Sequence, residues 1–187
     1  VEGACSAPQP PDILDQICVR LLDCGLPLHR VAVFVRTLHP NVIGRRFIWR
    51  PGAPVEVSAA PFSILGSDSF RLNPVPKVMR DAAPIRRRIA DPSGPDDFPI
   101  LEELRTEGVT DYLAQPLFFT DGATHAVSWT TTQPGGFTDA HIAALEAVQA
   151  PFARVAEIFA LRRTAANLLS TYVGRGSGER ILEGHVR

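Results

Sequence analysis

The feature that most constrains the fold is a pair of apolar segments that flank a short polar turn. Residues 111–119 (DYLAQPLFF) and 125–132 (HAVSWTTT) are separated by TDGAT and contain many β-branched and aromatic side chains. This pattern predicts a β-hairpin. Pro116 has no N–H group for a ladder hydrogen bond, so we expect it at a sheet edge or at a bulge. The chain is therefore expected to contain antiparallel sheet.

Two other parts of the sequence predict further strands. Residues 30–38 (RVAVFVRTL) alternate in a way that predicts a strand with one buried face, formed by Val31, Val33 and Val35. Residues 45–50 and 55–60 predict a second hairpin, because prolines and a glycine lie between them. Residues 85–90 (IRRRIA) predict a short edge strand, since adjacent arginines discourage pairing with another sheet.

Helix signals surround these strands. Asp12 is expected to cap a helix that runs to about Asp23, and the stretch 75–81 predicts a short helix. Another helix is expected to begin at Asp97 and to end before Gly108. The order of elements predicts an α+β domain with a mostly antiparallel sheet, helices on one face and a pocket on the other.

A long helix is predicted towards the end of the chain, with Thr138 as its cap. It carries two apolar series at the spacing of a heptad seam. The first series consists of Leu145, Val148, Phe152, Val155 and Phe159. The second series is one residue out of phase and consists of Ile158, Leu161, Ala165, Leu168 and Tyr172.

The change of phase predicts that the buried face of this helix rotates along its length. Its first half is then expected to pack on the sheet of its own subunit, and its second half on another helix. The alternative is a helix that covers only its own sheet. The dimer and signalling residues expected from the first interpretation are Phe152, Val155, Phe159, Leu161, Leu168 and Tyr172.

Composition limits the partners of the chain. A net charge of −1 argues against broad electrostatic binding to nucleic acid or to an anionic membrane. No apolar run approaches the roughly 18 residues that span a bilayer. The three cysteines lack CxxC spacing, which favours reduced thiols in a cytoplasmic protein.

The sequence contains no recognisable catalytic or metal-binding pattern. No pair among the five histidines has the spacing of a metal site. The acidic pairs Asp96–Asp97 and Glu102–Glu103 are typical of a helix start and of an exposed helical face. We therefore assign no catalytic residue and no metal ligand. No cofactor is implied, and the existence and identity of a small-molecule or chromophore ligand stay open.

Aromatic and basic residues from separate predicted elements suggest a ligand pocket. Trp49 and Trp129 are expected on one face of the sheet, with Arg36 and Arg50 nearby. Ordinary core packing is the favoured alternative for the aromatic residues. The full set expected at the pocket is Arg36, His39, Trp49, Arg50, Phe70, Tyr112 and Trp129.

Several long phrases resemble the N-terminal regulatory region of soluble bacterial class III adenylate and guanylate cyclases. They are GLPLHRVAVFVRTLHP (25–40), RFIWR (46–50), DFPILEELRTEGVTDYLAQPL (97–117), SWTTTQPGGFTDAHIAALEAV (128–148) and LLSTYVGRGSGERILEGHVR (168–187). The element order also resembles the GAF/PAS class of sensor domains. The resemblance implies a flexible N-terminal segment (1–11), a GAF-like sensor domain (12–166) and a helical, glycine-rich linker (167–187).

The same resemblance implies what this domain does. It points to a non-catalytic regulatory domain that controls a covalently attached class III nucleotide cyclase domain, with adenylate cyclase as the expected type. Such cyclases need two catalytic domains side by side, so a parallel homodimer is expected. Shifts in the packing of residues 152–173 would then bias the active dimer. The alternatives are a ligand-free structural dimerisation module and a small stand-alone enzyme.

Overall fold

A single antiparallel sheet forms the centre of the protein in a computed structural model that describes residues 9–39, 42–89 and 98–172. The sheet has six strands in the order β3-β2-β1-β6-β5-β4. Every neighbouring pair is antiparallel, which confirms both predicted hairpins and the edge position of residues 85–88. The strands are β1 (Arg30–His39), β2 (Val42–Trp49), β3 (Glu56–Pro61), β4 (Ile85–Arg88), β5 (Asp111–Phe118) and β6 (Thr124–Thr131).

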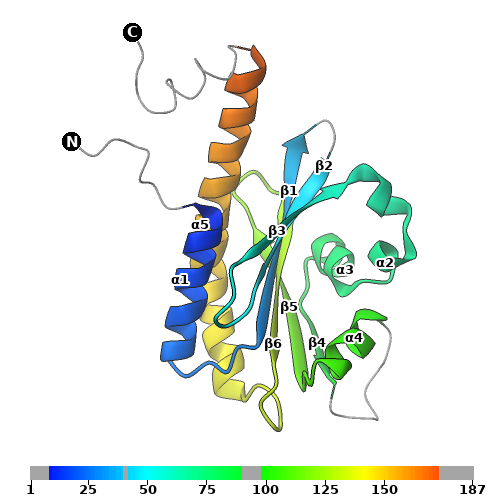
Figure 1. Cartoon of the computed structure of the whole chain (residues 1–187), viewed down its shortest axis with the longest axis vertical. Helices are drawn as coiled ribbons and strands as arrows, with labels where there is room; N and C mark the ends of the chain where they lie inside the picture. The colour runs from blue at the N-terminus through cyan, green and yellow to red at the C-terminus, as the bar shows by residue number, and fades with distance from the viewer. Residues whose placement is uncertain (1–8, 40–41, 90–97, 173–187) are drawn as a thin grey trace, which may run out of the picture.

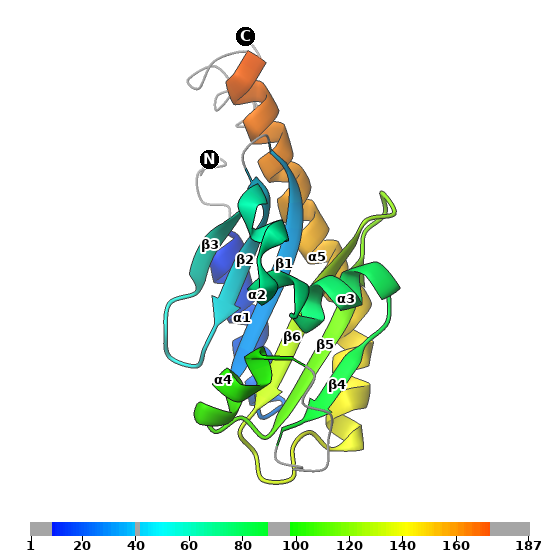
Figure 2. The same cartoon turned by 90° about the vertical axis from the view of Figure 1, so that its right-hand side faces the viewer.

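Helices cover both faces of this sheet. The first and last helices, α1 (Pro10–Asp23) and α5 (Asp139–Tyr172), lie side by side on one face (Figure 1). The other face carries four short helical segments (Figure 2), namely η2 (Phe62–Gly66), α2 (Asp68–Arg71), α3 (Pro74–Asp81) and α4 (Ile100–Thr106). The α+β class is confirmed, whereas the expectation of helices on one face alone is wrong. Both faces need cover because the central strands bury residues on each side.

The first helix begins three residues earlier than the sequence predicted, because its cap is Gln9 and not Asp12. Pro10 and Pro11 occupy its first turn, where the missing proline N–H costs no hydrogen bond. The Asp12 carboxylate accepts a hydrogen bond from the Gln9 N–H at 3.1 Å, so Asp12 stabilises the helix start from inside the first turn. The next helix, α4, begins at Ile100 with Pro99 as its cap, so the predicted start at Asp97, which itself lies outside the described residues, is too early. Thr138 does cap α5, because its hydroxyl accepts from the His141 N–H at 3.2 Å.

Pro116 lies where the loss of its N–H is tolerated. It pairs with Ala126 of β6 on one side. On the other side the pairing of β5 with β4 ends at Ala114. Pro116 thus sits beyond the end of β4, at a locally open edge of β5, as predicted. Its carbonyl oxygen accepts from Nε2 of Gln149 in α5 at 2.5 Å, which ties this edge to the long helix.

The larger core lies between the sheet and the helices α1 and α5. The pairing register places Trp49, Val31, Trp129 and Leu113 in a row across four strands. All four are buried and belong to one cluster, to which α1 contributes Leu14 and Cys18 and α5 contributes Leu145, Phe152 and Ala153. Burial raises the pKa of the Cys18 thiol well above its usual range. Cys18 is therefore a packing residue and not a reactive thiolate.

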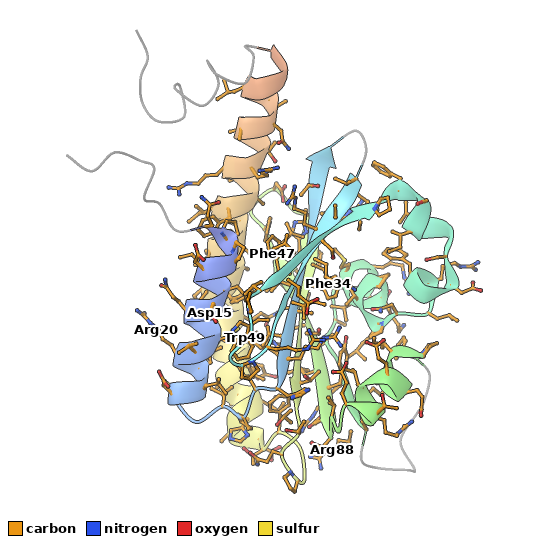
Figure 3. The ribbon with its side chains drawn as sticks, in the orientation of Figure 1. Asp15, Arg20, Phe34, Phe47, Trp49 and Arg88 are labelled. Atoms are coloured by element: carbon orange, nitrogen blue, oxygen red, sulfur yellow. The ribbon has the colours of Figure 1, made fainter. Side chains whose placement is uncertain are left out.

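A second core fills the space between the sheet and the short helices. Val78 of α3 and Leu104 of α4 are its most buried helical residues. The sheet contributes Ala114 and Ala126, small residues that let these helices approach closely. Phe34 packs against this cluster, on the opposite side of the sheet from Phe47 and Trp49 (Figure 3).

The long helix changes its environment along its length, as its two apolar series predicted. Leu145 and Phe152 of the first series are buried in the larger core. In the second series Ile158, Leu161 and Leu168 are 52%, 60% and 54% exposed. Figure 1 shows that the C-terminal end of α5 extends past the end of the sheet. The side chain of Tyr172 lies outside the described residues. Of the helices that the structure describes, none is both long and apolar enough to cross a bilayer.

Polar contacts of Glu157 and Arg154 join α5 to the end of β5 and the turn that follows it, and we call these contacts the Glu157 latch. The buried Glu157 carboxylate accepts hydrogen bonds from the N–H of Thr120 at 2.7 Å and from the Thr120 hydroxyl. Arg154 pairs with Glu157 at 2.5 Å and donates to the carbonyl oxygen of Phe118. The hydrogen bond from the Thr120 hydroxyl holds the pKa of Glu157 below its ordinary value, so this carboxylate stays charged.

Candidate functional site

Two hollows lie on opposite faces of the sheet. One is a polar pocket of about 60 Å³ between the sheet and the helices α3 and α4, which we call the arginine pocket. The other is an apolar groove of about 760 Å³ between α1, α5 and the strands β1 to β3. The arginine pocket brings together the polar side chains of the central strands, so it is the candidate functional site. It is lined by Arg30, Ala32, Phe34, Arg46, Asn73, Val75, Ile100, Leu104, Tyr112, Ser128 and Thr130.

Strand register builds the floor of the arginine pocket. Arg30 pairs with Thr130, and Thr130 pairs with Tyr112 on the next strand. Ser128 lies two residues before Thr130 and therefore on the same face of β6. The Thr130 hydroxyl donates to the Arg30 carbonyl oxygen at 3.1 Å, and the Tyr112 hydroxyl hydrogen-bonds with Ser128. Burial raises the pKa of Tyr112 far above its usual value, so this phenol remains a neutral hydrogen-bonding group.

Arg30 is the most unusual residue of the site, because it is a cation that is only 9% exposed. Its Nη1 lies 3.7 Å from Oε1 of Glu103 and 3.9 Å from Oε1 of Glu107. Both distances exceed hydrogen-bond length, and this buried Nη1 has no hydrogen-bond partner among the described residues. Burial lowers the pKa of the Arg30 guanidinium, the charge of Glu107 opposes this shift, and the nearby charge of Arg50 adds to it.

Two more arginines lie near Arg30. Arg46 lines the arginine pocket, whereas Arg50 does not line it but is close enough to lower the pKa of Arg30. Arg46 donates from Nε to the Ser58 hydroxyl at 3.2 Å. Arg50 donates from Nη1 to Oε1 of Glu56 at 2.7 Å, and its Nη2 lies 4.0 Å from Glu107. A buried guanidinium with a spare donor, next to neutral hydroxyls, is suited to bind a small group that accepts hydrogen bonds or carries negative charge.

The size of the arginine pocket limits its ligand. Pockets for drug-sized ligands usually measure about 300–1,000 Å³. The volume of about 60 Å³ instead fits a group of a few heavy atoms. Of the residues that the structure describes, no group of three or more histidine, cysteine, aspartate or glutamate side chains is placed to hold a metal ion.

The residues expected at one pocket lie in several places. Trp49 and Trp129 share a face of the sheet, as expected, but both are fully buried in the larger core. Their indole N–H groups donate to Oδ1 of Asp15 at 2.7 Å and to Oε1 of Gln115 at 2.9 Å. These tryptophans are thus satisfied core residues, on the opposite face from the arginine pocket.

The remaining residues of the expected set divide in a similar way. Tyr112 lines the arginine pocket, whereas Arg50 does not and lies 4.0 Å from Glu107. Arg36 follows Val35 on β1, and its backbone N–H donates to Nδ1 of His125 at 3.0 Å. Phe70 is half-buried in α2 and does not line the pocket. The backbone of His39 ends β1, and its side chain lies outside the described residues.

Of the residues that line the arginine pocket, sequence reasoning identified Tyr112 alone. It missed the apolar lining and five polar residues, namely Arg30, Arg46, Asn73, Ser128 and Thr130. A signal for two of them was present, because Ser128 and Thr130 alternate with Trp129 and so must face away from it. Arg30 lies on β1 and Arg46 on β2. Their approach depends on the register of these two strands, for example the pairing of Phe34 with Arg46, which the sequence alone does not give.

Comparison with known proteins identifies the fold. No protein-family model and no curated protein matches the sequence. The GAF domain of a two-component sensor histidine kinase from Bacillus halodurans is similar in structure, with a TM-score of 0.54 at 15% identity over 76% of this chain and 90% of that chain. This likeness shows that the chain has a GAF fold, as expected from the element order.

Two structures from Geobacter sulfurreducens are similar at lower scores. The GAF domain region of a putative membrane protein has a TM-score of 0.49 at 16% identity, over 78% of this chain and 92% of that chain. A GAF domain/HD domain protein has a TM-score of 0.48 at 21% identity, over 82% of this chain and 95% of that chain.

Proposed function

We propose that this chain is a non-catalytic regulatory module that dimerises through α5 and controls a class III nucleotide cyclase domain attached beyond that helix. The observation that carries the proposal is the exposed apolar stripe of Ile158, Leu161 and Leu168 in the second half of α5. Large apolar side chains in a regular stripe favour a protein partner. The heptad spacing favours a second helix as that partner.

The cyclase part of the proposal rests on the sequence phrases given above. In this arrangement residues 12–166 form the sensor, and residues 167–187 lead to the enzyme. The described part of that second segment, up to Tyr172, belongs to α5. A parallel pair of α5 helices brings two attached catalytic domains side by side. Signals that change the packing of α5 then change the activity of the enzyme.

The first prediction concerns the dimer. We expect this chain to be a dimer in sedimentation equilibrium over a range of protein concentrations. The double variant Leu161→Glu/Leu168→Glu should raise the dimer dissociation constant by at least about tenfold, because it places charges in an apolar seam. The matched control is Leu65→Glu/Leu72→Glu, which changes two exposed leucines on the other face of the sheet. A wild-type chain that stays monomeric at high concentration would contradict the dimer.

The second prediction concerns the cyclase. The catalytic domain of a class III adenylate cyclase is joined after Arg187, and two alanines are inserted after Leu169. The insertion turns the following helix by about 200°, whereas a seven-residue insertion returns it to within about 20° of its first orientation. We expect the two-residue insertion to change cyclic AMP production by about fivefold or more. The seven-residue insertion should restore most of the original rate.

This pair of insertions separates two interpretations. If both leave cyclic AMP production unchanged while the chain remains dimeric, α5 only holds two chains together. That result would favour the structural dimerisation module over the regulator.

A further inference from the structure

The apolar groove on the α1 and α5 side of the sheet is the larger of the two hollows described above. Its volume of about 760 Å³ falls within the range of small-molecule pockets. Its walls come from α1, from the sheet and from the second half of α5. Six half-buried or buried apolar residues define it best, namely Ile13, Ile17, Val35, Phe47, Val155 and Phe159. Figure 3 shows Phe47 between the sheet and α1. We call this hollow the α1–α5 groove.

Three arginines line the α1–α5 groove, and in the described part of the chain none of them forms a salt bridge with an acidic side chain. Arg45 comes from β2, and Arg162 and Arg163 come from α5, where Arg162 lies over the Phe159 ring at 6.0 Å from its centroid. Within the described residues, Arg45 and Arg163 form no salt bridge and no hydrogen bond. Burial lowers the pKa of the Arg45 guanidinium, and the like charge of Arg163 lowers it further. Arg45 is half-buried and Arg163 is exposed, so solvent screens part of the repulsion between the two cations, and a bound anion would offset the rest.

A third polar group lies in the same lining. The hydroxyl oxygen of Thr37 is buried, and within the described residues it has no hydrogen-bond partner. Val35 pairs with Arg45, and Thr37 follows Val35 by two residues on the same face of β1. One part of the groove thus carries two cations and an unsatisfied hydroxyl. The other part is lined by apolar side chains such as Ile17 and Phe152.

We propose that the α1–α5 groove binds a single-chain amphiphile with an anionic head, a fatty-acid carboxylate or an alkyl phosphate. The alkyl chain lies against Ile17, Phe47 and Val155, and the head is held by Arg45, Arg163 and the Thr37 hydroxyl. Charge complementarity selects this occupant, because the groove combines apolar walls with unpaired positive charge. Such a ligand contacts α1, β2 and the second half of α5 at once.

The test uses the complete 187-residue chain in isothermal titration calorimetry. The probes are laurate, dodecyl phosphate and dodecyltrimethylammonium, each below its critical micelle concentration. We expect both anionic probes to bind at one molecule per chain and the cationic probe to bind at least about tenfold more weakly. Octanoate should also bind at least about tenfold more weakly than laurate, because it buries fewer methylene groups. A preference between laurate and dodecyl phosphate then identifies the head group, and either preference supports the site.

Three variants locate the binding. The double variant Arg45→Gln/Arg163→Gln should raise the dissociation constant of laurate by at least about tenfold. It should also remove the preference for laurate over the cationic probe. Ala160→Phe places a large side chain in the groove from α5 and should weaken the binding of every probe. Its circular dichroism spectrum should stay as in the wild type. Arg88→Gln is the matched control, because this exposed arginine lies on the edge strand β4, away from the groove (Figure 3).

Several results would overturn the proposal. One is the absence of laurate and dodecyl phosphate binding to the full chain, and another is binding that the two arginine substitutions leave unchanged. Binding that appears only after removal of residues 1–8 would show that this segment, which contains Glu2, occupies the groove instead. Binding only to a dissociated monomer would assign the groove to the second copy. Each readout is independent of cyclase activity, so the binding site and the proposed function can fail separately.

Discussion

Replacing Asp111 by alanine should lower the free energy of unfolding by about 3–5 kcal/mol, the usual cost of removing one partner of a buried ion pair. Asp111 is fully buried at the start of β5. Its carboxylate accepts from Nη2 of Arg86 at 2.6 Å and from the N–H of Phe137 at 3.0 Å. The alanine variant leaves that N–H without a partner and the Arg86 guanidinium without its counter-charge. Urea denaturation followed by circular dichroism measures the loss.

The backbone around Asp111 explains why little can compensate for the substitution. Gly136 has a φ of +76°, and a Cβ at this position would meet Oδ2 of Asp111 at 2.6 Å. The segment before α5 therefore lies directly on the carboxylate. Arg86 also donates to the carbonyl oxygen of Phe137 at 2.6 Å, so one ion pair connects β4, β5 and the start of α5.

A surface ion pair supplies the control. Arg50 and Glu56 lie 2.7 Å apart, and Glu56 is 66% exposed. Glu56→Ala should cost no more than about 1 kcal/mol. If Asp111→Ala also costs less than that, the buried pair is not the structural link that its geometry indicates.

Replacing Trp129 by alanine should lower the free energy of unfolding by a similar amount, about 3–5 kcal/mol. Trp129 is fully buried at the centre of the sheet. Its ring packs edge-on against Phe152 of α5, with ring centroids 5.7 Å apart. The alanine variant leaves a cavity under α5 and an unpaired Oε1 on Gln115. Guanidinium denaturation measures the effect on the whole chain.

A double-mutant cycle isolates the contact between Trp129 and Phe152. The cycle combines Trp129→Leu and Phe152→Leu, each of which removes one aromatic ring of the pair and keeps an apolar side chain. We expect a coupling energy of about 0.5–1.5 kcal/mol for the aromatic pair. A coupling energy near zero would show that Trp129 stabilises the sheet alone and does not anchor α5.

The sheet was largely predictable because its signals are local. Alternation and turn residues predict the hairpin from Asp111 to Thr131, and the arginines of β4 predict an edge. The segments η2 and α2 were missed, because helices of five and four residues carry too little periodicity to detect. The start of α1 was missed because two adjacent prolines resemble a loop, although proline is favourable in a first helical turn.

The candidate site was predictable only in part, because it depends on strand register. Alternation alone shows that Trp129 and Ser128 face opposite ways. It does not show that Leu113 lies beside Trp129, which places Tyr112 on the opposite face from both tryptophans. The two unpaired arginines of the α1–α5 groove come from β2 and α5. No sequence pattern places residues that are so distant in the chain next to each other.

The Glu157 latch fixes one point of α5, and a tilt of the helix about this point moves the residues that follow Glu157 as a rigid arm. The helix continues for 15 residues from Glu157 to Tyr172, and at 1.5 Å per residue this arm is about 22 Å long. A tilt of roughly 5° about the latch therefore moves the end of the arm by about 2 Å. Movements of about 1–2 Å at helical interfaces are enough to switch proteins between states. A change too small to disturb the core can thus become a functional displacement at Tyr172.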